Sequence, residues 1–151
     1  MKIIVKENTE SLKFPLPIYT SIHIADATSH DNEEFYIFVG MDTDMVAELR
    51  ELSLDKNDTE LQKNTSDYKR FGTRPYEDWY FKTRIPFVFI HRKTKKIAAF
   101  VWLGPEPLFG NVSNWHTAGW RSYNPFRGKG LMKDFANFVI NFYIKKYPDI
   151  L

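Results

Sequence analysis

A basic, glycine-containing segment between an aromatic run and a long amphipathic run constrains the fold more than any other feature. Residues 123–133 read YNPFRGKGLMK. The residues before them alternate as in a strand, and those after them place apolar side chains at helical spacing, which predicts strand, turn and helix. Glycines let a ligand approach the backbone, and the free N–H groups of a helix's first turn attract anions. The segment therefore predicts a phosphate- or pyrophosphate-binding turn, to which Arg127, Lys129 and Lys133 add positive charge.

Two better-known phosphate-binding loops do not fit the segment. A Walker P-loop needs Ser or Thr directly after Gly-Lys to hold magnesium, whereas Gly130 follows Lys129 here. The dinucleotide fingerprint needs a third glycine at the position of Lys133. An unrelated nucleotide-binding α/β domain that works with magnesium is therefore the least favoured alternative.

The segment resembles the Gln/Arg-x-x-Gly-x-Gly/Ala turn of the GNAT family of N-acetyltransferases. Arg127 and Gly130 match two of the three fixed positions, and Met132 departs from the third. The resemblance extends loosely to the first half of the chain. It implies an α+β (α/β) fold with a mixed, mostly antiparallel central sheet flanked by helices. It also implies that the pyrophosphate of acetyl-CoA binds the turn through Arg127, Gly128, Lys129, Gly130, Leu131, Met132 and Lys133.

Length and composition limit the alternatives. A chain of 151 residues suits one domain, and a net charge of +2 gives no argument for nucleic acid binding. The sequence has no cysteine, which excludes disulfides and thiolate catalysis, and its histidines show no metal-ligand spacing, so we expect no metal. No apolar run is long enough to span a membrane, and the charged N-terminus does not fit a secretory signal, so we expect a cytoplasmic protein.

Apolar patterns predict the remaining elements. We expect strands over residues 2–5, 18–24, 35–39, 86–91, 97–103 and 115–123. We expect a helix that begins after Asp42, a short helix around residues 60–68, and a long helix from Leu131. Residues 25–34 are polar and predict a loop. Residues 86–91 are apolar on both faces, which predicts a strand covered on both sides.

The resemblance also implies where catalysis would occur. Family members place a Glu or His base on the fourth strand, where His116 stands in this chain. The alternative is a strand histidine that is hydrogen-bonded at the end of the sheet, and Glu106 is a weaker candidate base. Four aromatic residues would either line the acceptor pocket or pack onto the sheet, namely Tyr68, Tyr76, Trp79 and Tyr80.

The same strand would hold the pantetheine arm of acetyl-CoA. In the family the fourth strand splays from the fifth, and the arm pairs with exposed backbone as an added strand does. In this chain the pairing backbone would be that of Arg121, Ser122 and Tyr123. Gly119 would mark a bulge that drives the splay.

The resemblance further implies that the domain is incomplete. Family domains continue after this helix with a strand, a helix and a final strand pair, and residues 149–151 look like the opening of that strand. We therefore expect residues 1–151 to form a single GNAT-like domain that lacks its C-terminal part. An uncovered sheet edge would favour self-association as a homodimer.

The expected function is transfer of an acetyl group from acetyl-CoA to an amine acceptor, either a small molecule or a peptide. The amine would attack directly, because the sequence has no cysteine to form an acyl-enzyme. The alternative is a non-catalytic module that binds a CoA thioester or a protein partner, which Met132 and the incomplete end favour. We expect neither a nucleic acid nor a membrane as partner.

Overall fold

The structure is a computed structural model that describes residues 1–7, 9–105 and 116–148. Six strands form one sheet in chain order, and every neighbouring pair is antiparallel. The strands are β1 (Lys2–Val5), β2 (Ile22–Thr28), β3 (Glu34–Val39), β4 (Ile85–His91), β5 (Ile97–Pro105) and β6 (His116–Ser122). The α-helices are α1 (Thr43–Leu54), α2 (Thr59–Asn64), α3 (Tyr76–Tyr80) and α4 (Leu131–Lys146), with a 3-10 turn η1 (Thr9–Ser11) and a π-helical turn η2 (Tyr68–Thr73). The predicted α+β architecture with a mostly antiparallel sheet is confirmed.

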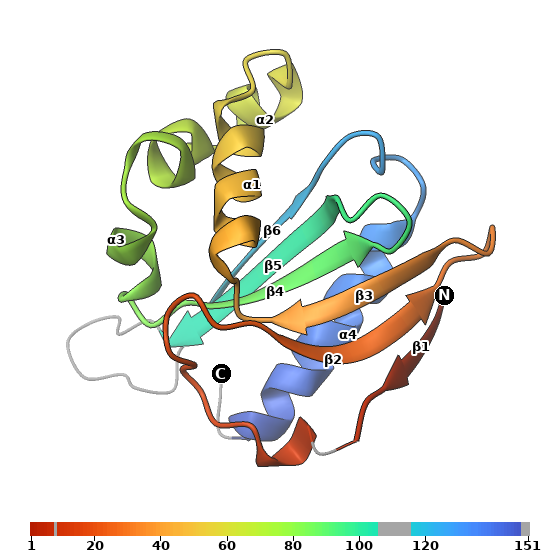
Figure 1. Cartoon of the computed structure of the whole chain (residues 1–151). Coiled ribbons are helices and arrows are strands. Elements are labelled where there is room, and N and C mark those ends of the chain that lie inside the picture. The colour runs from red at the N-terminus through yellow and green to blue at the C-terminus, as the bar shows by residue number, and fades with distance from the viewer. Residues whose placement is uncertain (8, 106–115, 149–151) are drawn as a thin grey trace.

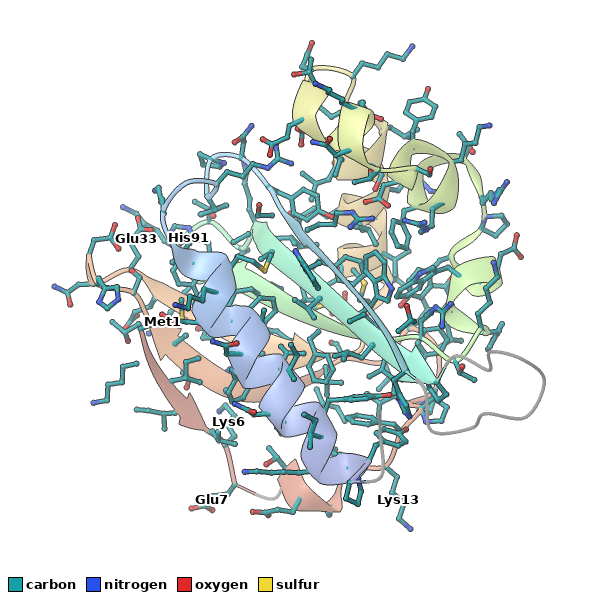
Figure 2. The ribbon with its side chains drawn as sticks, turned by 180° about the vertical axis from the view of Figure 1, so that it is seen from behind. Met1, Lys6, Glu7, Lys13, Glu33 and His91 are labelled. Carbon is teal, nitrogen blue, oxygen red and sulfur yellow. The ribbon has the colours of Figure 1, made fainter. Side chains whose placement is uncertain are left out.

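Helices cover both faces of the middle of the sheet. α1, α2 and α3 lie on one face, and α4 crosses the other (Figure 1). Figure 2 shows that the N-terminal end of α4 lies near His91 and that its C-terminal end lies toward Lys13. All residues of β4 are buried, which confirms the prediction of a strand covered on both sides.

The sheet divides the interior into two cores. Phe100 and Trp102 of β5 pack with α1 and α3, whereas Val101 and Leu103 of the same strand pack with α4. This division follows from strand geometry, because successive side chains point to opposite faces. We call the two clusters the α1-side core and the α4-side core.

The two longest helices begin as the sequence predicts. The Asp42 side chain caps α1 by accepting a hydrogen bond from the Met45 amide at 2.9 Å. α4 begins directly after the glycine segment. Its buried side chains recur at every fourth position and pack on the sheet, namely Leu131, Phe135, Val139 and Tyr143.

The prediction of a loop over residues 25–34 is wrong for its first part, because β2 continues to Thr28. Ala25 and Ala27 are buried while Asp26 is exposed, as in a half-covered strand. A register shift between His23 and Ala25 interrupts the alternation. This part of the strand was not predicted because its buried side chains are small and its alternation is irregular, whereas the prediction relies on large apolar residues.

Two further expectations differ from the structure. In place of one helix around residues 60–68, the chain forms α2 and then the separate turn η2. The register between β5 and β6 shows no shift, so the predicted bulge at Gly119 is wrong. A Cβ atom at Gly119 would lie 2.2 Å from the Trp102 ring, so the glycine makes room for that ring. Glu106 and the predicted strand opening at residues 149–151 lie outside the described residues.

Candidate functional site

The segment between β6 and α4 is anchored to the core by Phe126. Its amide donates to the Tyr123 carbonyl at 2.8 Å, which closes a turn. The Phe126 ring is buried, and its centroid lies 6.2 Å from that of Phe35 and 5.1 Å from that of His91. The start of the segment is therefore held by packing against the sheet.

Gly128 and Gly130 give the segment an open outer surface. Their φ angles are +77° and +71°, which glycine adopts without the strain that other residues suffer. A Cβ atom at either position would have no atom of the described residues within 4 Å, so the backbone can be approached from outside. A pocket of about 110 Å³ lies beside both glycines and is also lined by Ser122 and Met132.

α4 begins at this open surface without a side-chain cap. Gly130 is its N-cap residue and makes no side-chain capping bond within the described part of the chain. The first amides of the helix therefore keep their hydrogen-bonding capacity, and the positive end of the helix dipole lies there. Lys129 and Lys133 are exposed beside these amides. The geometry suits an anion, and the identity of that anion stays a prediction.

Arg127 lines the pocket beside the two glycines, and its guanidinium pairs with Asp58, the N-cap residue of α2. Its two terminal nitrogens lie 2.6 and 2.8 Å from the two Asp58 oxygens, and its Nε donates to the Ser122 carbonyl at 2.8 Å. Burial alone would raise the pKa of Asp58, but hydrogen bonds from Arg127 and from the Leu61 amide outweigh it and hold this pKa below its ordinary value. Arg127 is thus a structural part of the turn, and the predicted contact between its side chain and pyrophosphate stays untested.

The backbone of β6 alternates between the sheet and its open edge. The Tyr123 amide donates to the Ala98 carbonyl at 3.0 Å, so by antiparallel alternation the backbone of Arg121 also points to β5. The backbone of Ser122 and Trp120 then points to the edge. Of the three residues predicted to pair with the pantetheine arm, only Ser122 has this orientation, and its carbonyl already accepts from Arg127.

The Arg121 side chain is held on the α1 side of the sheet. Its Nε lies 2.6 Å from Oδ2 of Asp67, whose side chain is fully buried, and its guanidinium stacks 4.8 Å from the Trp102 ring centroid. Arg70 donates to the same carboxylate at 2.8 Å. Sequence reasoning missed Asp58 and Asp67, since both lie in a polar stretch with no pattern that names a partner.

His116, the predicted base, lies at the start of β6 and contacts α4. Its Nδ1 is 2.5 Å from the Tyr143 hydroxyl, and its ring centroid is 5.1 Å from that of Tyr147. Burial lowers the pKa of His116 below its ordinary value, so the imidazole is neutral at pH 7. The contact matches the alternative of a hydrogen-bonded histidine at the sheet end, and a catalytic role stays a prediction.

The aromatic residues between the first helices and β4 mostly belong to the core. Tyr76, Trp79 and Tyr80 are buried in the α1-side core, and Tyr68 is half-buried. The Trp79 ring packs edge-on against Phe71 with centroids 5.1 Å apart. Packing, rather than the lining of an acceptor pocket, therefore accounts for the three buried side chains.

An acidic groove of about 770 Å³ runs along α1 beside the β4–β5 turn. Four carboxylates of α1 and its ends line it, with one lysine, namely Asp44, Glu48, Glu51, Asp55 and Lys96. Glu48 is half-buried and accepts a hydrogen bond from the Ile97 amide at 2.6 Å, and burial raises its pKa. The spacing of these acids in the sequence already places them on one helix face, which sequence reasoning overlooked. The groove attracts cations and does not suit an anionic ligand.

The described residues hold neither a metal-binding cluster nor a membrane-spanning helix. No group of three or more His, Cys, Asp or Glu side chains there could hold a metal ion. None of the described helices is long and apolar enough to cross a membrane.

The fold is similar to that of a GNAT domain whose structure is solved. The crystal structure of the GNAT domain of S. lividans PAT superimposes with a TM-score of 0.57 at 12% sequence identity, over 80% of this chain and 72% of that chain. No protein-family model matches the sequence, and no curated protein matches it. The likeness shows a GNAT-like fold, as the glycine segment predicts.

Proposed function

We propose that this protein is an N-acetyltransferase that moves an acetyl group from acetyl-CoA to an amine. One observation carries the proposal: the GNAT-like fold presents an uncapped helix start behind two open glycines, Gly128 and Gly130. The amides of residues 128–131 would hold the diphosphate, and Lys129 and Lys133 would add charge. The outward backbone of Ser122 and Trp120 would hold the pantetheine arm at the edge of β6.

The reaction needs few protein groups. The amine nitrogen attacks the thioester carbonyl, an amide bond forms, the carbon–sulfur bond breaks, and the CoA thiolate leaves and takes up the proton that the nitrogen releases. An acceptor in its ammonium form must first lose a proton, and His116 is the candidate proton acceptor, because its lowered pKa keeps the imidazole neutral. Positioning of the two substrates would supply much of the rate.

Calorimetric titration with acetyl-CoA and CoA tests the binding part. We expect wild-type protein to bind both, and the Lys129→Glu/Lys133→Glu variant to bind about tenfold more weakly. The matched control is Lys13→Glu/Lys69→Glu, which reverses two exposed lysines that do not line the pocket at the turn. Equal affinity of the two variants would refute the proposed location, and no binding by wild type would refute the proposed function.

A second candidate is a non-catalytic module that binds a CoA thioester or a protein partner. It is favoured by His116, whose Nδ1 is engaged by buried Tyr143 on the α4 side of the sheet. Acetyl release in the presence of a panel of primary amines separates the two candidates. Tight binding of acetyl-CoA without turnover would favour the module.

A further inference from the structure

The carboxylate of Asp58 serves two elements that are far apart in the sequence. Its Oδ1 accepts a hydrogen bond from the Leu61 amide at 3.1 Å, which caps α2. The same carboxylate receives both terminal nitrogens of Arg127, 69 positions later in the chain, at 2.6 and 2.8 Å. α2 and the glycine segment are therefore joined through one side chain.

This ion pair is sheltered from water. The Asp58 side chain is 9% exposed and that of Arg127 is 15% exposed. A two-pronged, charge-assisted contact with this little exposure holds its geometry better than a solvated surface pair. Arg127 also holds the Ser122 carbonyl at 2.8 Å, so one guanidinium fixes both the end of β6 and the entry to the turn.

The open part of the turn has few restraints of its own. Gly128 and Gly130 carry no side chains. Among the described residues, no atom lies within 4 Å of the place where a Cβ atom would stand at either glycine. Glycine backbone is the most costly to order, so its conformation depends on what holds the two ends. α4 holds one end, and Arg127 together with the buried Phe126 ring holds the other.

We infer that Asp58 is a positioning residue for the anion-binding turn, acting through Arg127. The inference rests on the proposed function for the identity of the anion, acetyl-CoA. A turn that is already ordered binds its ligand without paying the ordering cost at that moment. Asp58 therefore strengthens the binding of an anion, although its own charge is negative.

A simple charge effect predicts the opposite sign. If Asp58 acted only as a negative charge near the turn, removing that charge would strengthen anion binding. If its carboxylate merely occupied Arg127 in place of a ligand phosphate, removing it would also strengthen binding. Weaker binding is expected only if the pair orders the turn.

Two substitutions separate the two tasks of Asp58. Asp58→Asn keeps a good helix cap and removes the carboxylate that Arg127 needs. Asp58→Glu keeps a carboxylate within reach of Arg127 and loses the favoured cap. Glu60→Gln is the matched control, because Glu60 lies on the same helix, 3.8 Å from Arg127, and is 69% exposed.

Affinity for acetyl-CoA and amide hydrogen exchange of residues 127–131 are measured for each protein. We expect Asp58→Asn to bind about tenfold more weakly and to exchange faster in the unliganded state, with Asp58→Glu close to wild type. We expect Glu60→Gln to match wild type or to bind slightly better. Thermal melting shows that each variant is folded at the temperature of the assay.

Three outcomes decide against the inference. If the Asp58→Asn variant binds acetyl-CoA as tightly as wild type, or more tightly, the inference is overturned. If Asp58→Glu loses affinity for acetyl-CoA and Asp58→Asn does not, Asp58 acts only as a helix cap, and the inference is also overturned. If wild-type protein binds no acetyl-CoA, the proposed function fails, while unchanged exchange of residues 127–131 in Asp58→Asn would still overturn the positioning role.

Discussion

The Tyr143 hydroxyl lies 2.5 Å from Nδ1 of His116 and joins the last turns of α4 to the first residue of β6. Tyr143 is fully buried, and burial raises the pKa of its hydroxyl, so it stays protonated and can donate. In that arrangement the neutral imidazole carries its proton on Nε2, which can then donate to a substrate or water. His116 can act as a base through Nε2 only in the other tautomer, in which Nδ1 donates to the Tyr143 hydroxyl.

Removing the hydroxyl should cost stability only where it has a partner. We expect Tyr143→Phe to lower the free energy of unfolding by about 1 kcal/mol, because the hydrogen bond to His116 is lost. Tyr123→Phe is the matched control, since the Tyr123 hydroxyl is buried without a hydrogen-bond partner in the described residues. That variant should be neutral or slightly more stable. Urea unfolding of both variants checks the difference, and equal losses would contradict it.

The pKa of His116 should appear in the pH dependence of stability. Burial lowers this pKa in the folded state, so below about pH 6.5, the ordinary value, the unfolded chain binds more protons than the folded one. His116 therefore makes stability fall as the pH drops from that value toward the folded pKa. We expect His116→Gln to show a weaker fall over this window in thermal melts at a series of pH values. If His116 is the base, the variant also loses acetyl transfer at pH 7.

Glycines at two positions should respond to alanine for different reasons. A Cβ atom at Gly104 would lie 2.1 Å from the Thr83 carbonyl oxygen, which is backbone and cannot move aside easily. We expect Gly104→Ala to cost about 3 kcal/mol. Gly130→Ala meets no atom within 4 Å in the described structure, so it should cost only about 1 kcal/mol, from its positive φ angle. Chemical unfolding measures both, and a larger loss for Gly130→Ala would contradict the steric account.

Asp67 should be sensitive to the loss of its charge. Its side chain is fully buried, and its carboxylate forms ion pairs with both Arg70 and Arg121. Asp67→Asn leaves both arginines without a compensating charge, so we expect a loss of about 3 kcal/mol. Asp78→Asn, at an exposed aspartate, is the control and should change stability little. Denaturant midpoints measure both variants. If Asp67→Asn loses no more stability than the control, the Asp67 carboxylate does not stabilise the fold through its two arginines.

Glu48 should make the protein less stable as the pH rises. Burial raises its pKa in the folded state, so its contribution to stability is fully present below the unfolded pKa and is lost as the pH rises through the folded one. Glu48→Gln keeps an oxygen for the Ile97 amide and removes the buried charge. We therefore expect the substitution to raise the free energy of unfolding by about 0.5 kcal/mol at pH 7 and to leave it unchanged at pH 4. Thermal melts at the two pH values test this, and a loss at pH 7 would contradict it.

The open edge of β6 bears on self-association. β6 is the last strand of the sheet in the described residues, and Trp120 on it is 56% exposed. We propose that two copies pair through this edge, which the pantetheine arm would also use. We expect sedimentation velocity to show a concentration-dependent dimer that acetyl-CoA dissociates. A monomer at all concentrations would refute the pairing, and a dimer that survives saturating acetyl-CoA would place it elsewhere.

Local patterns predicted the parts of the molecule that depend on local physics. The glycines at 128 and 130 and the apolar spacing after Leu131 were sufficient to place an open turn at a helix start. β4 and β5 were recognisable because large apolar side chains fill both of their faces. The strand predicted over residues 18–24 ends before β2 does, because alanines and an irregular register weaken the alternation of apolar and polar side chains.

The partners of charged residues could not be predicted in the same way. The basic glycine segment predicts Arg127 as a phosphate ligand, and nothing near Arg127 in the chain indicates Asp58, 69 positions away, as its partner. The family resemblance predicts His116 as the base from its place on the fourth strand, whereas its contact with Tyr143 depends on where α4 crosses the sheet. Pairings of this kind are decided by the assembled fold, where several equally polar residues compete for one guanidinium or imidazole.

The division of the interior into an α1-side and an α4-side core restricts how this chain can vary over time. From Ala99 to Leu103, adjacent residues of β5 belong to different cores, so inserting or deleting one residue within this stretch would turn α1-side side chains toward α4 and α4-side side chains toward α1. Aromatic rings shaped for α1 and α3 would then face α4, and the aliphatic side chains would face the wrong way as well. The spacing between Ala99 and Leu103 should consequently be inherited unchanged, even in relatives whose side chains at these positions have drifted.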